Sequence, residues 1–328
     1  MQHTYSRRSL LKLMATGAAA LATGTVFTSC QKKPEQSADP AGTPSAPNPQ
    51  ANGSESQPKD TENPKRLVFF FTGTGNCLFV ASQLSPNVIS IPQALKNNEL
   101  EYEAEEIGIV YPIYGQMMPN IVKKFLNTAK LKAQYFFAIG TYGNRKGHSV
   151  DKCAESAQKA GYTFDYIATL LMVDNWLPRF DMDEQLKIDK KIGPNLAKII
   201  SDLEERKKYI EPYEENENSL PLPENNPSKV PAGTFDADGV HAKAEDWFTI
   251  LDTCVACGLC TRVCPRANYT LEGEIAVCKG ECELCLACVH ACPHKAIVIT
   301  YGEANPKARY RNPNVSMRDI MKANNQRG

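Results

Sequence analysis

Eight cysteines near the C-terminus are the residues of this chain best suited to chemistry. They form two runs with the same spacing, C-x2-C-x2-C-x3-C, and a proline follows each run. Thiolates at this spacing hold three corners of an iron–sulfur cubane, while the fourth cysteine of each run reaches the other cluster. The sequence therefore predicts two [4Fe–4S] clusters with crossed ligands, which are Cys254, Cys257, Cys260 and Cys292 for one and Cys282, Cys285, Cys288 and Cys264 for the other.

The doubled motif resembles that of the bacterial two-cluster ferredoxins, and all eight ligand positions are filled. The resemblance implies a small α+β domain, which we expect at residues 243–301. The alternatives are a disulfide framework and paired zinc sites. Neither accounts for the repeated spacing, because structural zinc sites usually combine two short pairs. Cys153 and Cys278 lie outside the pattern, and we expect them to be small buried residues.

A loop of hydroxyl-bearing residues and glycines forms a second candidate site. It follows the apolar run 67–71 and precedes a segment with helical periodicity at 78–84. A strand, such a loop and a helix N-terminus can together surround a phosphate with backbone N–H groups and hydroxyls. Because the loop has no lysine and no G-x-G-x-x-G pattern, it is not a nucleoside triphosphate loop or a dinucleotide loop. The candidate residues are Thr72, Gly73, Thr74, Gly75, Asn76 and Cys77.

This loop is similar to the FMN-phosphate loop of flavodoxins, whose usual pattern is T-x-T-G-x-T. Cys77 stands where that pattern has a final threonine or serine, so the resemblance implies one hydroxyl contact fewer. The alternative is a tight turn whose glycines serve the backbone alone.

Apolar runs and helical stretches alternate after this loop. The expected strands are residues 88–91, 107–111, 135–139 and 166–173, and the expected helices are residues 119–130, 147–161 and 182–208. This alternation predicts an α/β doubly wound parallel sheet of the flavodoxin-like type, over residues 66–210. Ligands of such sheets bind beyond the carboxyl ends of the strands, at the point where the strand order reverses.

Two loops that follow the third and fourth expected strands carry tyrosines flanked by glycine or proline. An isoalloxazine ring needs flat apolar partners and backbone groups at its polar edge, which such loops supply. A single tyrosine of this kind is more often a partly buried loop aromatic, but three loops in flavodoxin order favour FMN binding. The candidate residues are Tyr111, Pro112, Tyr114, Gly115, Thr141, Tyr142, Gly143 and Asn144.

The N-terminus has the features of an export signal. Arg7 and Arg8 precede a mildly apolar stretch that ends at Cys30, and this resembles a twin-arginine signal joined to a lipoprotein cleavage box. Phe27 is unusual for such a box, and the alternative is a chance arginine pair before an alanine-rich segment. We expect a signal at residues 1–30 with Cys30 lipidated, a disordered tether at 31–65, and an extracytoplasmic protein anchored to a membrane.

The remaining segments and the charge complete the organisation. Residues 211–242 are polar and proline-rich and are predicted to be a linker, and residues 302–328 form a tail with a short expected helix at 317–323. With 37 basic and 37 acidic side chains, the chain offers nothing that favours nucleic acid as a partner. His241, His290 and His294 are isolated histidines. We interpret His290 and His294, which flank a cysteine run, as surface residues or hydrogen-bond donors near the clusters, because the cysteines already supply every ligand.

The order of a flavodoxin-like half and a two-cluster ferredoxin half resembles a bacterial and archaeal fusion family of electron-transfer proteins. The resemblance covers roughly residues 66–325 and includes the segments 172–176, MVDNW, and 309–313, RYRNP. It implies electron transfer between FMN and two [4Fe–4S] clusters, with other redox proteins as partners. A flavin-dependent reductase of a small substrate and a redox-sensing lipoprotein are the alternatives.

Overall fold

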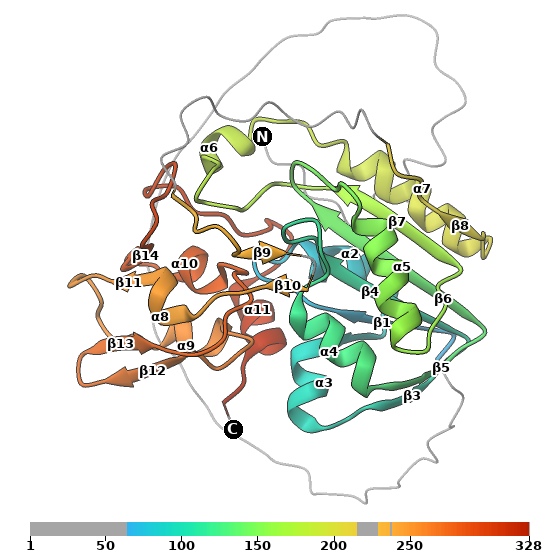
Figure 1. Cartoon of the computed structure of the whole chain (residues 1–328), viewed down its shortest axis with the longest axis horizontal. Coiled ribbons are helices and arrows are strands. Elements are labelled where there is room, and N and C mark those ends of the chain that lie inside the picture. The colour runs from blue at the N-terminus through green and yellow to red at the C-terminus, as the bar shows by residue number, and fades with distance from the viewer. Residues whose placement is uncertain (1–63, 215–228, 237, 328) are drawn as a thin grey trace, which may run out of the picture.

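The computed structural model describes residues 64–214, 229–236 and 238–327 (Figure 1). The expected signal with Cys30, most of the tether and part of the linker lie outside these residues. Within the described part of the chain, no helix is both long and apolar enough to span a membrane.

Six parallel strands form the main sheet of the first half. They are β1 (Arg66–Phe70), β2 (Val88–Ser90), β4 (Glu106–Pro112), β6 (Tyr135–Tyr142), β7 (Tyr166–Leu171) and β8 (Tyr209–Ile210). Their order in the sheet is β2-β1-β4-β6-β7-β8, and each neighbouring pair runs parallel. Counted along the sheet strands, this is the 2-1-3-4-5 order of the flavodoxin-like fold with one more strand at its edge. The predicted fold class of this half is confirmed.

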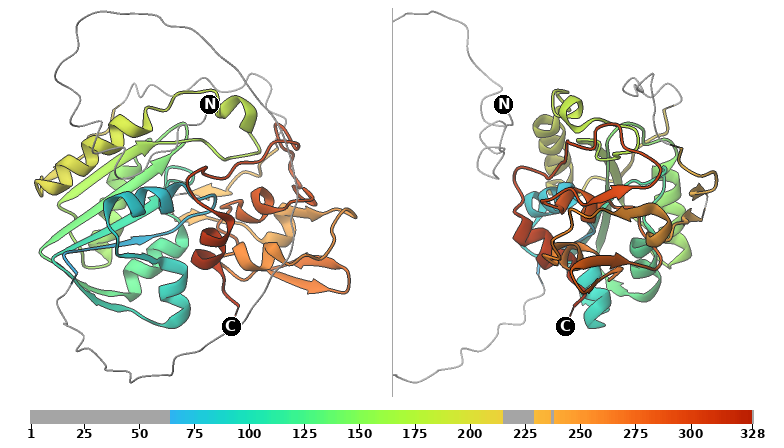
Figure 2. Two further views of the ribbon diagram at one scale, coloured as in Figure 1. Left: turned by 180° about the vertical axis from the view of Figure 1, so that it is seen from behind. Right: turned by 90° about the vertical axis from the view of Figure 1, so that its left-hand side faces the viewer.

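Helices cover both faces of this sheet because its central strands are apolar on both sides. The helices are α2 (Asn76–Leu84), α3 (Ile91–Asn97), α4 (Asn120–Thr128), α5 (Ser149–Lys159) and α7 (Ile192–Glu204). Figures 1 and 2 show α4 and α5 on one face and α2 and α7 on the other. Two short parallel strands, β3 (Glu101–Glu103) and β5 (Lys130–Lys132), pair away from the main sheet.

The single helix expected at residues 182–208 was wrong. The chain forms a short helix α6 (Met182–Gln185), and α7 starts only after Lys191, whose φ is 52°. Pro194 lies in the first turn of α7, the only place in a helix where a proline is tolerated without loss of a hydrogen bond. A second difference concerns β6, which extends to Tyr142, so that part of the predicted loop at 140–144 is strand.

The second half is built from very short elements that carry the two cysteine runs. They are β9 (Phe235–Asp236), β10 (Gly239–Val240), α8 (Ala244–Trp247), β11 (Phe248–Ile250), α9 (Leu259–Val263), β12 (Tyr269–Glu272), β13 (Ile275–Cys278), α10 (Ala287–Ala291), β14 (Ile297–Ile299) and α11 (Met317–Asn324). Strand β11 pairs with β14 and β12 with β13, both antiparallel. In each of these pairs, one strand lies next to the first cysteine run in sequence and the other lies next to the second. The two copies of the motif are therefore intertwined.

The two halves are packed against one another. Val263, Cys285 and Ala291 belong to the same buried cluster as the sheet. Helix α4 begins after Pro119, whose side chain cannot cap it, and the carboxylate of Glu283 lies close enough to the backbone N–H groups of Asn120 and Ile121 for them to lower its pKa against the effect of burial. An acidic side chain of the second half therefore lies at the N-terminus of a helix of the first. The expected tail helix is confirmed as α11, which packs on α3 and α9.

Candidate functional site: a loop-lined cavity beside two cysteine quartets

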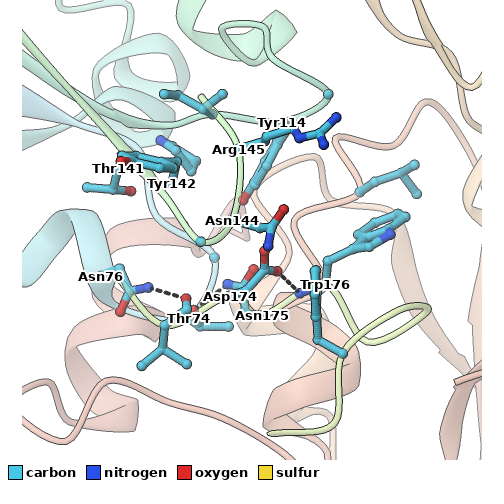
Figure 3. A pocket seen from close by; sticks show the side chains of 18 of the residues that line it. Thr74, Asn76, Tyr114, Thr141, Tyr142, Asn144, Arg145, Asp174, Asn175 and Trp176 are labelled. Atoms are coloured by element: carbon cyan, nitrogen blue, oxygen red, sulfur yellow. Dashed lines mark hydrogen bonds between the residues drawn. The ribbon is translucent and has the colours of Figure 1, made fainter. Parts of the chain in front are cut away.

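A cavity of about 570 Å³ lies at the carboxyl ends of β1, β4 and β6 (Figure 3). The loop after β1 and the two tyrosine-bearing segments meet there, as sheet topology requires. The predicted residues that line it are Thr72, Gly73, Thr74, Asn76, Cys77, Pro112, Tyr114, Gly115, Thr141, Tyr142, Gly143 and Asn144.

Two predicted residues do not line the cavity. The ring of Tyr111 is buried in the core, where its hydroxyl hydrogen bonds with the thiol of Cys153. Gly75 has a φ of 100° at the start of α2, and a Cβ there would press on Val315 and Asn312 of the tail. Gly75 therefore serves the backbone conformation and the packing of the tail, and not the wall of the cavity.

The loop after β1 is organised by hydrogen bonds before any ligand binds. The N–H of Gly75 donates to Oγ1 of Thr72 over 3.0 Å. Oγ1 of Thr74 accepts from Nδ2 of Asn175 over 2.6 Å, so the hydroxyl proton of Thr74 points to another acceptor. Thr74 is thus set to donate a hydrogen bond, as a phosphate site requires.

Asn76 has a different role from the one expected. Its Nδ2 donates to the carbonyl of Val173, and its Oδ1 accepts from the hydroxyl of Tyr310 (2.7 Å) and from Nδ2 of Asn312 (3.1 Å). Three of its four hydrogen-bonding positions are thus used within the protein. Asn76 joins the loop to the segment after β7 and to the tail, the same two segments that carried the family resemblance.

Cys77 forms a neutral part of the cavity wall. Its Sγ lies 3.1 Å from Oγ1 of Thr141, and burial raises the pKa of the thiol to about 12. The thiol therefore stays protonated near neutral pH and can exchange a weak hydrogen bond with a hydroxyl.

The segment after β7 supplies site residues that sequence reasoning did not select. Asp174, Asn175 and Trp176 all line the cavity, together with Arg145 and Arg179. Figure 3 shows Asp174 and Asn175 between Thr74 on one side and Trp176 on the other. The MVDNW segment was noted only as a family feature, and its position just after a sheet strand was the signal that could have identified these residues.

The carboxyl of Asp174 is a buried acidic group of the cavity with a raised pKa. Its Oδ1 accepts from the N–H of Trp176 over 2.9 Å. Burial raises the pKa of Asp174 from 3.8 to about 6, against the opposing effect of that N–H group, Lys190 and Arg179. Burial likewise lowers the pKa of Lys190 to about 8, and its Nζ donates to the carbonyl of Gly143 and to Oε1 of Gln185.

The cavity fits a flat ring with a phosphorylated chain. Tyr114 and Trp176 supply aromatic faces, and the buried hydroxyl of Tyr114 has no hydrogen-bond partner among the described residues. A Cβ at Gly115 would clash with Phe235, and one at Gly143 with Asp174, so only glycine allows these walls to come so close. A buried hydroxyl without a partner is costly, and a bound ligand would satisfy it.

The structure brings the cysteines together in the two crossed quartets. Burial raises the pKa of Cys260 to about 12, and Cys254, Cys257 and Cys292 lie close enough to raise it further. Burial also raises the pKa of Cys288 well above its ordinary value, and the neighbouring thiols that add to this effect are Cys264, Cys285 and Cys282. Each quartet thus contains three cysteines of one run and the last cysteine of the other.

The described residues contain no group of three histidine, cysteine or acidic side chains close enough to hold one metal ion. In a cubane the four thiolates bind four different irons, so they stand farther apart than the ligands of a single ion.

The backbone around both quartets is shaped in the same way. Ala256 and Gly258 in the first run have φ of 50° and 72°, and Leu284 and Leu286 at the matching positions of the second have 50° and 55°. A left-handed backbone at leucine costs free energy. Because the same left-handed backbone recurs at equivalent positions of both runs, it points to a functional constraint.

Backbone N–H groups point at the sulfur atoms. The donors, at 3.3–3.4 Å, are Asn268 to Cys264, Ala276 to Cys254, Leu284 to Cys282 and Ala296 to Cys292, and the hydroxyl of Tyr269 donates to Cys288. Hydrogen bonds of this kind tune the sulfur ligands of iron–sulfur clusters. The donor set therefore fits two such clusters.

One quartet lies against the cavity and the other faces away from it. A Cβ on Gly73, in the loop after β1, would clash with the carbonyl oxygen of Cys285. Leu284, the residue before it, lines the cavity itself. In contrast, Cys257 of the first quartet is exposed to solvent.

His290 connects the second half to the cavity. Its Nδ1 accepts from the N–H of Tyr310 over 3.0 Å, so its Nε2 carries the proton and donates to the carbonyl of Asn175 over 2.9 Å. Burial lowers the pKa of His290 to about 4, which keeps the ring neutral. It is a buried residue that holds the MVDNW segment in place. His241 and His294 are exposed, and Cys153 and Cys278 are buried as expected.

Comparisons with known proteins find weak likenesses to three flavoproteins, at TM-scores of 0.25 each. The first is the Flv1 flavodiiron core from Synechocystis, at 14% sequence identity, with 44% of this chain and 38% of that chain covered. The second is a flavoprotein from Bacteroides uniformis, at 12% identity, with 38% of this chain and 97% of that chain covered. The third is rubredoxin oxygen:oxidoreductase from Desulfovibrio gigas, at 15% identity, with 42% of this chain and 37% of that chain covered. The match spans less than half of the first of these. No family model and no curated protein matches the chain. At this level the assignment of the fold rests on the strand order.

Proposed function

We propose that this protein transfers electrons between FMN, bound in the cavity, and two [4Fe–4S] clusters on the crossed quartets. FMN exchanges one or two electrons and each cluster exchanges one, so their combination would link two-electron and one-electron reactions. The observation that carries the proposal is the contact between Gly73 and Cys285. It sets the predicted phosphate loop directly against a cysteine of one quartet.

Each part of the cavity would have one task in binding. The hydroxyl of Thr74 and the backbone N–H groups at the start of α2 would hold the phosphate, without any lysine. Tyr114 and Trp176 would pack on the ring, and the hydroxyl of Tyr114 would gain its missing partner. Asp174 would be held close to the bound molecule by the N–H of Trp176.

A carrier of electrons is favoured over a reductase with its own small substrate. Val230 and Phe235 come from the segment that joins the two halves, and both line the cavity. Phe235 also packs edge-on against Trp176, with ring centres 5.6 Å apart. With the ring packed on Trp176, these side chains would limit the space left for a small substrate.

We also propose that the chain is exported in the folded state and anchored to a membrane through Cys30. The twin-arginine route carries folded proteins, which suits a chain that must receive its clusters in the cytoplasm. Replacing Arg7 and Arg8 by lysine keeps the charge and removes the signal. The double variant should accumulate in the cytoplasm with cofactors bound, and normal membrane fractionation and lipid labelling would contradict the proposal.

The cofactor content is the direct test of the proposed function. Anaerobic purification, followed by measurement of iron, acid-labile sulfide and flavin, should give two four-iron clusters and one FMN per chain. Titration of the flavin-free protein should show that FMN binds far more tightly than riboflavin. Equal affinity for the two would mean that the loop does not hold a phosphate.

The Thr74→Ala variant tests the loop itself. It removes one donor to a charged group, worth about 1.5–3 kcal/mol, so FMN affinity should fall by about one to two decades while riboflavin affinity hardly changes. Thr128→Ala is the matched control, because the hydroxyl of Thr128 bonds only to carbonyls of α4. A loss of FMN affinity in both variants would reflect general destabilisation.

A further inference from the structure

Exposed apolar side chains gather around the quartet that faces away from the cavity. In the described part of the chain, most of the large apolar side chains that are exposed lie on two segments, and they are Leu251, Val255, Leu271 and Ile275. Val255 is the most exposed of them, at 57%, and it lies between two cysteines of that quartet. Contiguous exposed apolar residues on a folded protein typically mark a contact surface.

The two segments form one surface. The first is the loop at residues 249–258, and the second is the β12–β13 hairpin at 269–278. The N–H of Ala276 donates to Sγ of Cys254 over 3.4 Å, so the hairpin lies directly on the cysteine loop. A Cβ on Gly258 would lie 3.6 Å from Leu271. Figure 1 shows this hairpin at the end of the molecule opposite the main sheet.

The charge of this surface has one sign. Its ionisable side chains other than cysteine and tyrosine are Asp252, Glu272 and Glu274, all exposed, and neither segment has a lysine or an arginine. The nearest basic residues along the chain are Arg262, which is exposed on α9, and Lys279, which follows the hairpin and lies close enough to Glu245 to lower its pKa. Apolar residues with an acidic border are complementary to a partner with apolar residues and a basic border.

The other quartet offers no comparable access. Cys264, Cys285 and Cys288 are buried, and Leu284 and Gly73 lie between that quartet and the rest of the first half. The first quartet, in contrast, has Cys257 at the surface. Electrons that leave or enter the protein by way of a cluster therefore have their shortest route to solvent at Cys257.

We propose that the surface formed by residues 249–258 and 269–278 is the docking site of a redox protein with a one-electron centre surrounded by basic residues. The inference rests on the proposed electron-transfer function. In the forward direction one electron passes to the partner, which is reduced as the cluster on Cys254, Cys257, Cys260 and Cys292 is oxidised, and no bond forms or breaks. An acidic surface does not complement itself, which disfavours a second copy of this chain as the occupant.

Binding to a defined probe tests the docking surface apart from any turnover. The probe is cytochrome c, a small haem protein with a lysine-rich face, and its acetylated form, in which those lysines are neutral, is the paired control. Binding would be measured by calorimetry at low and at high salt. We expect binding of the native cytochrome only, weaker at high salt because the charges are screened.

Two sets of variants locate the contact. Asp252→Asn, Glu272→Gln and Glu274→Gln together should weaken binding by about tenfold and flatten its salt dependence. The matched control combines Glu99→Gln, Glu155→Gln and Glu204→Gln, three exposed acidic residues of the first half, and should leave affinity unchanged. Val255→Ser should weaken binding without altering the salt dependence.

The outcomes separate the two proposals. Three outcomes would overturn the docking surface. The first is equal weakening of binding by both triple variants, and the second is no binding of native cytochrome c. The third is a dimer, seen by light scattering, that dissociates in the first triple variant. Iron, sulfide and flavin are measured on every sample. Absence of clusters from the wild-type protein would refute the proposed function, whereas intact clusters with no effect of the first triple variant would refute the docking surface alone.

Discussion

The two halves of this molecule are held together by different means. The first half has a six-stranded sheet whose central strands are buried on both faces, and its core contains large side chains such as Phe69, Phe125 and Phe137. The second half has helices α9 and α10 of five residues each and strands of at most four. Elements this short gain little from their own hydrogen bonds. The comparison teaches that the first half can fold by apolar burial, whereas the second depends on what its cysteines bind.

The largest expected effect is the loss of a single ligand in the second half. Cys292→Ser should destroy or convert the cluster whose other ligands are Cys254, Cys257 and Cys260, because the quartets are crossed. Paramagnetic resonance of the reduced variant should show one cluster signal lost or changed to a three-iron type, with FMN still bound to the first half.

Cys153→Ser is the control for this variant, because Cys153 is buried beneath the sheet and belongs to neither quartet. Loss of the signal from the cluster on Cys282, Cys285 and Cys288 in the Cys292→Ser protein would contradict the crossed arrangement. Loss of FMN as well would mean that the first half also depends on the cluster for its folding.

The next effect concerns the contact between the halves. Gly73→Ala adds a Cβ that clashes with the carbonyl oxygen of Cys285, and overpacking of this kind costs about 1–3 kcal/mol. Urea unfolding followed by flavin and by cluster absorption should show lower midpoints in both signals. Gly161→Ala is the control, because no atom lies near its Cβ and only the left-handed backbone is affected. A shift in one signal alone would show that the halves are independent.

A smaller effect should depend on pH. Burial raises the pKa of Asp174 from 3.8 to about 6, so the folded protein binds a proton that the unfolded chain has released between these values. This contribution to stability is complete below pH 3.8 and is lost as the pH rises through about 6. Asp174→Asn should therefore gain stability relative to wild type over this range. The exposed Asp252→Asn is the control, and a difference that stays constant with pH would refute the prediction.

The smallest effect is expected where the tail meets the loop after β1. Tyr310→Phe removes one of the two donors to Oδ1 of Asn76, which should cost about 0.5–1.5 kcal/mol in thermal unfolding and weaken FMN binding slightly. Tyr213→Phe is the matched control, because Tyr213 is exposed and stacks on His148, away from Asn76 and the tail. Equal stability of wild type and the Tyr310 variant would mean that Asn312 suffices to hold Asn76.

The sheet could be predicted because its pattern is local. Continuous apolar runs such as residues 67–71 and 107–111 are typical of strands buried on both faces, and their alternation with helices favours a parallel sheet. The prediction of one helix at 182–208 was wrong because it relied on the helical periodicity of the whole segment. Pro194, which lies in the first turn of α7, indicates that a helix starts there. The short strands of the second half have no periodicity that could reveal them, and the cysteine spacing was the only guide there.

The candidate site was predictable only where consecutive residues form it. The loop at 72–77 and the cysteine runs are such segments. Tyr111 was misplaced because side chains alternate along a strand, and whether a residue at the end of β4 faces the core or the cavity depends on the exact end of the strand. Asp174 lies in the cavity wall and His290 supports that wall at Asn175, and both depend on contacts between distant segments. Spacing along the chain carries no signal for these contacts.

The support of the loop after β1 also sets the order of events when the protein is made. The carbonyl of Thr72 accepts from Nδ2 of Asn324, and the carbonyl of Thr74 accepts from the N–H of Asn312. A chain grows from its N-terminus, so the sheet can assemble on the ribosome while this loop still lacks those partners. The loop is therefore completed only after residue 324 has left the exit tunnel. Stable loading of the cavity is therefore expected only after synthesis has passed both cysteine runs.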